Sequence, residues 1–206
     1  VFLGVAGVPE YAAALLMDRS VAPYYVAPVT TGSASRHRNL VTIYLESGEN
    51  AYGVPAVLGR NLLADLDGAT RGWARYSSLQ QYPGGGWTMS GLVSTQCGIP
   101  LKSRSLIDGM NMNNLGEEVA SYLPGATCLG DVLASHGYTN VFLGGANSRF
   151  AGKGTFLTGH GYERVRGLTD WEAEGESSSE VSVWGLSDRR LFAHAAQEVD
   201  RLRAAG

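Results

Sequence analysis

Pro83-Gly84-Gly85-Gly86-Trp87-Thr88-Met89-Ser90-Gly91 is a glycine-rich turn that runs directly into small and apolar residues. Glycines allow the backbone to turn tightly and to approach a ligand, and the residues that follow predict a helix that begins at about Thr88. The first N–H groups of a helix have no partners within it, and the helix dipole favours negative charge there. Thr88 is therefore a candidate nucleophile. The alternative is that it is an ordinary N-cap beside a loop.

The segment upstream of this turn supplies a candidate metal ligand. Residues 40–45 are apolar and rich in β-branched side chains, which predicts a buried strand, and Glu46 follows directly at its carboxyl end. Open α/β sheets bind their ligands at that edge. No histidine lies close to Thr88 in the sequence to serve as its base. We therefore expect a metal ion held by Glu46 to activate the Thr88 hydroxyl.

The remaining patterns alternate between helices and strands, as an α/β fold requires. They predict helices over 54–66, 89–95, 127–136 and 187–204, and strands over 72–79 and 138–143. Residues 102–125 contain no clear period and are interpreted as an irregular excursion.

The strand over 138–143 ends in two glycines, and polar and cationic residues follow it. Asn147, Arg149 and Lys153 then lie at the edge of the sheet that Glu46 also faces. A cationic side chain at this edge fits a substrate phosphate, and Arg149 fits a structural salt bridge equally well. His160, the other histidine near this surface, is interpreted as a helix-end residue that backbone groups satisfy.

The two cysteines, Cys97 and Cys128, leave three interpretations open. They form no CxxC pair and have no histidines at zinc-ligand spacing, but a metal pair, two buried thiols and one disulfide all fit the sequence.

Composition narrows the class of protein. A chain of 206 residues with 44% hydrophobic and 17% charged residues is typical of a globular domain, and a net charge of −3 argues against nucleic acid as a partner. Residues 1–17 are apolar but contain Pro9 and Glu10, so we expect a juxtamembrane or a short soluble helix and no transmembrane span. Residues 18–38 are interpreted as a linker with a basic end.

Four blocks together resemble a known family. They are Asn39-Leu40-Val41-Thr42-Ile43-Tyr44-Leu45-Glu46-Ser47, Gly86-Trp87-Thr88-Met89-Ser90-Gly91 with Ser94-Thr95-Gln96-Cys97-Gly98-Ile99-Pro100-Leu101, Cys128-Leu129-Gly130-Asp131, and Gly145-Ala146-Asn147-Ser148-Arg149-Phe150-Ala151-Gly152-Lys153. In this order they are similar to the phosphoglycerol transferases that modify periplasmic glucans, which are relatives of lipoteichoic acid synthases in the alkaline phosphatase and sulfatase superfamily.

The resemblance implies an alkaline-phosphatase/sulfatase-like three-layer α/β sandwich with a mostly parallel sheet. Residues 1–38 would be a juxtamembrane segment and linker, and residues 39–206 the N-terminal portion of the catalytic domain. Glu46 and Thr88 match the family's metal ligands, and Thr88 matches its nucleophile. The remaining ligands, among them an Asp-His pair, are expected beyond Gly206. We therefore expect the sheet and the metal site to be incomplete at the C-terminus and this chain alone to be inactive.

The function that the resemblance implies is transfer of phosphoglycerol from phosphatidylglycerol to a periplasmic glucan or another polyol. It would use a covalent intermediate on Thr88 and a divalent metal, usually Mn²⁺, at the periplasmic face of the inner membrane. An exported domain is expected to be oxidised, which favours the Cys97–Cys128 disulfide. Lipoteichoic acid synthases carry Trp-Asn-Arg where this chain has Ala151-Gly152-Lys153, so Lys153 is the expected substrate contact, with the bidentate geometry of arginine lost.

Two kinds of alternative remain. One is another enzyme of the superfamily, a sulfatase-like phosphatase or a phosphoethanolamine transferase; the formylglycine run of sulfatases, Cys/Ser-x-Pro-x-Arg, is absent at Thr88. The other is a non-catalytic domain that binds a glycan or a lipid.

Overall fold

The computed structural model describes residues 21–31, 38–76, 78–82, 85–101 and 119–205, and the chain divides into two units. Unit 1 contains residues 1–30 and 82–206, and unit 2 contains residues 31–81. Each unit is described by itself. The expected helix over 1–17, residues 18–20 and 32–37 of the linker and residues 102–118 of the expected excursion lie outside the described residues.

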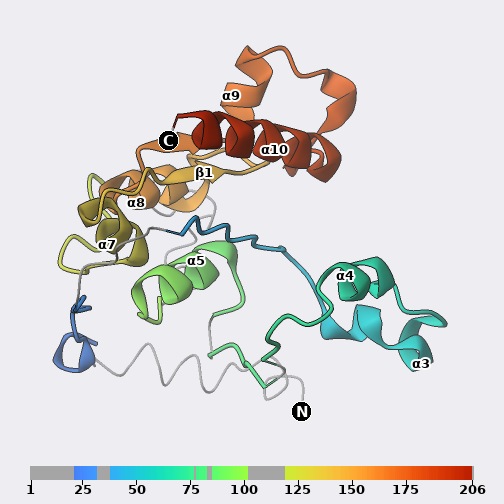
Figure 1. Ribbon diagram of the computed structural model, residues 1–206, viewed down its shortest axis with the longest axis horizontal. Helices are drawn as coiled ribbons and strands as arrows, with labels where there is room; N and C mark the ends of the chain where they lie inside the picture. The colour runs from blue at the N-terminus through green and yellow to red at the C-terminus, as the bar shows by residue number, and fades with distance from the viewer. Residues whose placement is uncertain (1–20, 32–37, 77, 83–84, 102–118, 206) are drawn as a thin grey trace, which may run out of the picture. The chain divides into compact units, whose positions relative to one another are not determined.

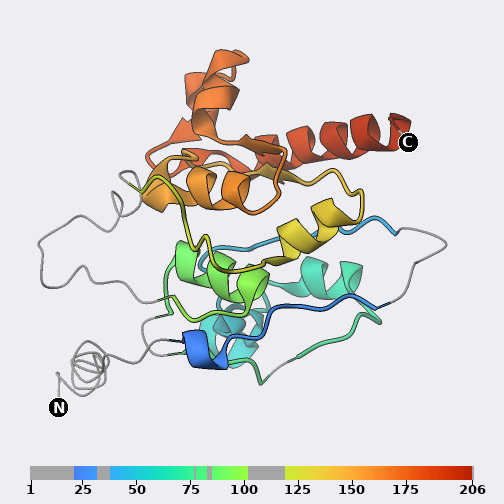
Figure 2. The same cartoon turned by 90° about the vertical axis from the view of Figure 1, so that its left-hand side faces the viewer.

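A strand–helix–strand connection organises unit 1. Strand β1 (Val141–Leu143) pairs in parallel with β2 (Arg164–Arg166), and η4 (Phe150–Gly152) and α8 (Lys153–Gly159) connect them. Phe142 pairs with Val165 at the centre of this register. Figures 1 and 2 show α9 (Leu168–Ala173) and α10 (Asp188–Ala204) on one side of this strand pair and α5 (Thr88–Cys97) on the other. The α/β class is confirmed.

The core of unit 1 lies where α5, α7 (Leu129–Ser135) and α8 meet. Its fully or almost fully buried members are Met89, Leu92, Val93, Cys97, Ile99, Cys128, Ala151, Phe156 and Leu157. Close backbone approach makes this packing possible, because a Cβ on Gly161 would lie 2.6 Å from the carbonyl oxygen of Gly130. The core therefore holds the start of α5 against the segment that follows β1.

A second layer follows β2. It contains α9, η5 (Ser178–Glu180), the hairpin of β3 (Val181–Ser182) and β4 (Gly185–Leu186), and α10. Ser187 caps α10 as predicted, since its Oγ accepts from the Arg190 N–H at 3.4 Å. The apolar side of α10 is partly uncovered, as its sequence predicted, with Phe192 52% exposed.

The regular elements in the described residues of unit 2 are short helices. They are η2 (Asn50–Gly53), α3 (Pro55–Leu58) and α4 (Ala64–Ala69), while η1 (Ala22–Tyr24) belongs to unit 1. The single helix predicted over 54–66 is therefore wrong. It is interrupted because Gly59 adopts a left-handed conformation with φ 75° and ends α3. Asp67 accepts hydrogen bonds from Asn61 at 3.0 Å and Arg75 at 2.9 Å, which ties the end of the unit together.

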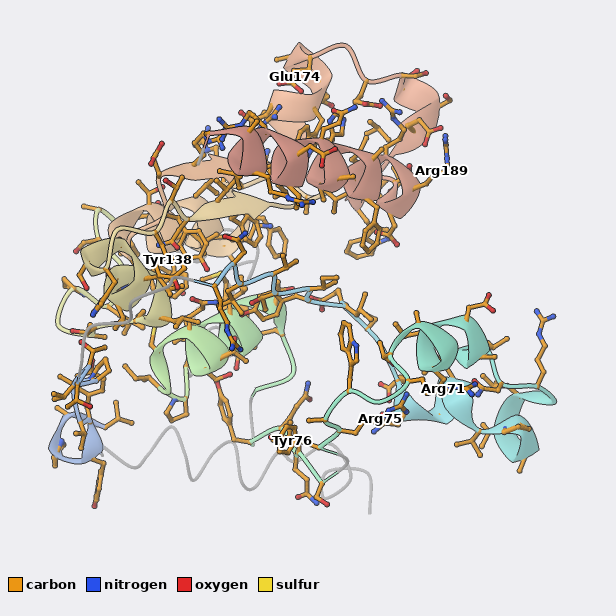
Figure 3. The ribbon with its side chains drawn as sticks, viewed as in Figure 1. Arg71, Arg75, Tyr76, Tyr138, Glu174 and Arg189 are labelled. Carbon is orange, nitrogen blue, oxygen red and sulfur yellow. A yellow bond between two sulfur atoms is a disulfide. The ribbon has the colours of Figure 1, made fainter. Side chains whose placement is uncertain are left out.

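The two strands predicted in unit 2 are also wrong. Residues 40–45 are extended but pair with no other strand in the described part of the chain, and Leu40 and Ile43 are 57% and 59% exposed. The described residues of 72–79 form no strand either, and Tyr76 lies exposed on an irregular segment (Figure 3). A strand needs a hydrogen-bonded neighbour, and the described part of unit 2 contains none.

The longest helix in the described ranges is α10, with 17 residues, and none of the helices there is long and apolar enough to cross a membrane.

Candidate active site

Thr88 is the first residue of α5. The N-cap position belongs to Trp87, which has an extended backbone (φ −144°, ψ 157°) and whose carbonyl accepts from the Gly91 N–H at 3.1 Å. The predicted helix start is confirmed, and the interpretation of Thr88 as the N-cap is replaced by Trp87. Thr88 is half-buried, so its hydroxyl lies in the first turn of a ten-residue helix whose dipole favours an anion.

Tyr82 fixes the turn before α5. Its hydroxyl donates to the Leu101 carbonyl at 3.0 Å, accepts from the Leu101 N–H at 2.7 Å and contacts the buried Ser90 hydroxyl. The Gly85 N–H donates to the Tyr82 carbonyl at 2.8 Å, and a Cβ on Gly85 would lie 2.9 Å from that oxygen. The glycine is thus required by close approach, and both ends of α5 are tied to one phenol.

Trp87 is a candidate that the sequence reasoning missed. Its indole packs against the core, and its Nε1 is buried without a hydrogen-bond partner among the described residues. A buried donor left unpaired costs about 1–3 kcal/mol, so such groups call for a specific explanation. Because Trp87 directly precedes Thr88, its indole is a candidate contact for a bound ligand.

Cys97 and Cys128 form a disulfide, with 2.00 Å between their sulfur atoms. The bond joins the last residue of α5 to the N-cap of α7 and confirms the expected pairing. The other two interpretations, free thiols and a metal pair, are therefore excluded in this structure.

Asp131 and His160 lie against this disulfide in a network that is already satisfied. One Asp131 oxygen accepts from the Cys128 N–H and contacts His160 Nδ1, each at 2.8 Å, and His160 Nε2 lies 2.8 Å from the Tyr122 carbonyl. His160 is 3% exposed and is the C-cap of α8, so its predicted role at a helix end is confirmed, with a carboxylate as its second partner. Burial also raises the pKa of the Tyr122 phenol.

The ligand atoms of Cys128, Asp131 and His160 all lie within 4.8 Å of one another, which is metal-site spacing. However, the Cys128 sulfur is bonded to another sulfur and offers no thiolate, and the histidine and the carboxylate are hydrogen-bonded. This cluster does not fit a divalent metal while the disulfide is intact. The sequence-predicted ligands, Glu46 and Thr88, supply a carboxylate and a hydroxyl, oxygen donors that suit Mn²⁺ or Mg²⁺.

The structure places Asn147 and Arg149 on the turn after β1 and Lys153 at the start of α8. Asn147 Oδ1 accepts from the Arg149 N–H at 2.9 Å, which makes a tight turn, and the Arg149 side chain is exposed. None of the ion pairs found among the described residues involves Arg149, so the salt-bridge alternative has no support there.

Lys153 occupies a different environment, because it is 5% exposed and its ammonium lies 5.7 Å from the centre of the Phe142 ring. Ala151 and Gly152 precede it with φ of 52° and 72°, and this left-handed pair turns the chain into α8. A non-glycine residue in that conformation stores strain, which is a feature of functional sites.

Glu46 belongs to unit 2, where it is exposed at a turn. Ser47 directly after it has φ 56°, so a second non-glycine residue in the left-handed region adjoins a candidate residue. Glu46 and Thr88 are thus in separate units, and each is described within its own.

Behind the turn after β1, Trp171 is fully buried between two cationic or basic side chains. The Arg166 guanidinium lies 4.1 Å from its ring centre, and the His194 ring stacks on it at 4.4 Å. Its Nε1–H donates to the Gly144 carbonyl at 2.8 Å. The end of β1 is therefore fixed by a residue on α9.

Two carboxylates anchor α10 beside this stack. A hydrogen bond from Arg190, followed by one from His194, lowers the pKa of Glu176 to about 2. Glu180 accepts from the Ser187 hydroxyl at 2.5 Å and pairs with Arg189, and the hydrogen bond from Ser187 is the main cause of its lowered pKa. Figure 3 shows Arg189 at the N-terminal end of α10 and Glu174 at the end of α9.

Curated proteins similar to this chain carry one functional name. Phosphoglycerol transferase I of Xanthomonas campestris pv. campestris is 34% identical over 187 residues, which are 91% of this chain and 26% of that protein. Phosphoglycerol transferase I of Salmonella paratyphi B is 34% identical over 189 residues, which are 92% of this chain and 24% of that protein. The chain is a homologue of the phosphoglycerol transferases I. It spans about a quarter of the length of these curated relatives. No family model matches it.

Among solved structures, a protein in the alkaline phosphatase superfamily from Vibrio parahaemolyticus has the same fold. The TM-score is 0.51 at 24% identity, over 74% of this chain and 34% of that protein. This neighbour confirms the predicted alkaline-phosphatase-like fold, and the expected resemblance to phosphoglycerol transferases is confirmed by the curated homologues.

Proposed function

We propose that this chain forms the nucleophile-bearing part of a phosphoglycerol transferase, with residues 39–206 as the N-terminal portion of the catalytic domain and residues 1–38 leading into it. The observation that carries the proposal is the position of Thr88. It begins α5 directly after a glycine turn that Tyr82 holds, in a chain 34% identical to phosphoglycerol transferases I. A hydroxyl in the first turn of a helix is placed where negative charge is stabilised.

The proposed reaction has two transfers at phosphorus. In the first, Thr88 Oγ forms a bond to the phosphorus of phosphatidylglycerol, the bond to the diacylglycerol oxygen breaks, and the hydroxyl proton ends on diacylglycerol. In the second, an acceptor hydroxyl forms a bond to phosphorus, the Thr88–phosphorus bond breaks, and the acceptor's proton returns to Thr88 Oγ. A covalent intermediate divides one difficult displacement into two easier ones.

Glu46 and Thr88 are the residues of this chain proposed to hold a divalent metal, and Mn²⁺ is the proposed ion. When bound, such an ion favours the alkoxide form of Thr88 and offsets the charge of the phosphoryl oxygens. Asn147, Arg149 and Lys153 are the proposed substrate-binding residues. The exposed Arg149 guanidinium on a tight turn supports a phosphate contact, since it presents several donors in a fixed plane. Lys153 adds a second, buried positive charge next to the same turn.

The proposed donor is phosphatidylglycerol, the proposed acceptor is a glucan or another polyol, and the proposed place is the periplasmic face of the inner membrane. A disulfide between Cys97 and Cys128 supports an oxidising compartment.

Labelled phosphatidylglycerol tests the proposal directly. The full-length polypeptide is incubated with Mn²⁺ and phosphatidylglycerol labelled in the headgroup glycerol, without acceptor, and the protein is digested and mapped. We expect label on the peptide that carries Thr88 and release of diacylglycerol in equal amount. Label on a different residue, or hydrolysis without any labelled protein, would contradict the assignment. Phosphatidylethanolamine in place of the donor separates a phosphoethanolamine transferase from the proposed enzyme.

A further inference from the structure

The hairpin of β3 and β4 presents an aromatic side chain to solvent. Val183 and Trp184 are its two loop residues, and they are 94% and 83% exposed. Single exposed apolar residues are common on proteins and carry no meaning by themselves. What distinguishes Trp184 is the rigidity of its support and the position of that support.

The loop is held in one conformation by polar contacts at its base. The Trp184 N–H donates to the Ser182 hydroxyl at 3.1 Å, and the same hydroxyl donates to the Gly185 carbonyl at 3.3 Å. Gly185 has φ 117°, a conformation that side-chain-bearing residues avoid. The backbone that carries the exposed indole is therefore pre-organised, so a ligand that contacts the indole costs little freedom of the loop on binding.

The base of the hairpin is joined to the candidate substrate turn. The Leu186 N–H donates to the Gly145 carbonyl at 3.0 Å, and a Cβ on Gly185 would overlap that same carbonyl. Gly145 follows β1 and directly precedes the turn of Asn147 and Arg149. Trp184 thus projects from a hairpin that is hydrogen-bonded to the backbone just before the proposed phosphate contacts.

The charges around the hairpin select among ligands for an exposed indole. Residues 172–190 carry five acidic side chains and two arginines, and Glu180 and Arg189 form an ion pair at the hairpin's edge. An anionic lipid surface is repelled by this segment. A neutral sugar is not repelled, and a pyranose has an apolar C–H face for the indole and hydroxyls for carboxylate and guanidinium partners.

We propose that Trp184 is a stacking platform for a sugar ring of the acceptor, at a subsite next to the turn after β1. This inference rests on the proposed phosphoglycerol transfer to a glucan and names a residue that would contact the acceptor. In the second transfer the sugar ring would rest on the indole while one of its hydroxyls reaches the phosphorus on Thr88.

The test compares a ring acceptor with one that has no ring. Wild type, Trp184→Ala and Trp184→Phe of the full-length polypeptide are assayed with a soluble β-glucan oligosaccharide and with ethylene glycol as acceptors. We expect Trp184→Ala to raise KM for the oligosaccharide about tenfold more than KM for ethylene glycol, since one aromatic contact is worth about 1.4 kcal/mol. The phenylalanine variant is expected to recover most of the difference, and Val183→Ser, which alters the same loop without removing the ring, to behave as wild type.

Three outcomes would overturn the inference. Equal effects on both acceptors, together with a lower Tm of Trp184→Ala, would show that protein covers the indole. If Trp184→Ala leaves the acceptor KM unchanged but weakens binding to phosphatidylglycerol vesicles, the indole contacts a lipid bilayer. Unchanged values in both assays would show an idle side chain.

Calorimetric titration with the oligosaccharide separates this inference from the function on which it rests. If the wild type transfers nothing but binds the oligosaccharide through Trp184, the proposed transfer fails and the glycan subsite stands. If the protein transfers phosphoglycerol and binds the oligosaccharide equally well with and without Trp184, the proposed transfer stands and the glycan subsite fails.

Discussion

Trp171 on α9 donates its Nε1–H to the carbonyl of Gly144 at 2.8 Å, and this hydrogen bond links the second layer of unit 1 to the carboxyl end of β1. Because Trp171 is itself held between Arg166 and His194, the turn that carries Asn147 and Arg149 depends on residues far along the chain. The contribution of this hydrogen bond to stability can be measured separately from that of the packing of the ring.

Trp171→Phe is expected to lower the free energy of unfolding by about 1–3 kcal/mol, because it keeps a stacked ring but leaves the Gly144 carbonyl without its donor. Trp171→Ala is expected to cost about 3–5 kcal/mol, since it also leaves a cavity. Urea denaturation of the full-length polypeptide measures both changes. A Trp171→Phe variant that unfolds with the same free energy as wild type would show that the hydrogen bond contributes nothing.

The disulfide predicts that the unreduced, denatured protein contains no free thiol. Two titratable thiols would contradict the pairing of Cys97 with Cys128. The Cys97→Ser/Cys128→Ser double variant should be destabilised by about 3.5 kcal/mol, because the bond closes a loop of sequence separation 31 and restricts the unfolded chain. The reduced wild type, which lacks the bond but keeps both side chains, serves as the control for the substitutions themselves.

Glu176 predicts acid sensitivity in a defined range. Its ordinary pKa of 4.5 is lowered to about 2 in the folded chain, chiefly by the hydrogen bond from Arg190. Between about pH 2 and pH 4.5 the Glu176 carboxylate binds a proton in the unfolded state but not in the folded state. The contribution of Glu176 to stability is therefore complete above about pH 4.5 and is lost as the pH falls towards 2. Glu176→Gln should flatten the dependence of unfolding free energy on pH in this window.

The matched control for that experiment is Glu172→Gln, a change at an exposed glutamate four residues away that forms no ion pair among the described residues. It should leave the steep acid range in place. The same flattening in both variants would show that general charge, rather than the Glu176–Arg190–His194 contacts, sets the acid response.

Local sequence predicted α5, α7, β1 and α10 of unit 1, because their signals are local. The glycine turn before Thr88, the cap at Ser187 and the apolar run before Gly144 all place helix or strand ends where the structure has them. Capping and turn formation involve only a few neighbouring residues, so these residues are sufficient to predict where such helices and strands end.

The failures have a different cause, since they concern pairing and packing over long separations. Residues 40–45 have the composition of a buried strand, but strand formation depends on partners that the described part of unit 2 does not supply. The contacts of Trp171 with Gly144, Arg166 and His194 join residues up to 27 positions apart. The sequence alone has no local signal for them.

The Cys128–Asp131–His160 cluster predicts a negative result that depends on redox state. With the disulfide intact, the 206-residue chain should bind neither Zn²⁺ nor Mn²⁺ with micromolar affinity, because the proposed ligands Glu46 and Thr88 would supply two ligands where a closed site needs about four or more. Calorimetric titration measures this. Micromolar binding that survives Glu46→Gln and Asp131→Asn would show a site composed of other residues.

The nucleophile and the metal ligand should be separable by two single substitutions. In the full-length polypeptide Thr88→Ala is expected to abolish phosphoglycerol transfer, because it removes the oxygen that bonds to phosphorus, and to alter stability by at most about 1 kcal/mol. Glu46→Gln is expected to abolish transfer through loss of the metal. Thr88→Ala should therefore keep most of its bound Mn²⁺ while Glu46→Gln binds the ion much more weakly, which metal analysis after gel filtration can measure. Thr88→Ser keeps a hydroxyl and should retain part of the activity. If Thr88→Ala transfers at a rate near that of wild type, Thr88 is only the first residue of α5 and the nucleophile must be sought elsewhere.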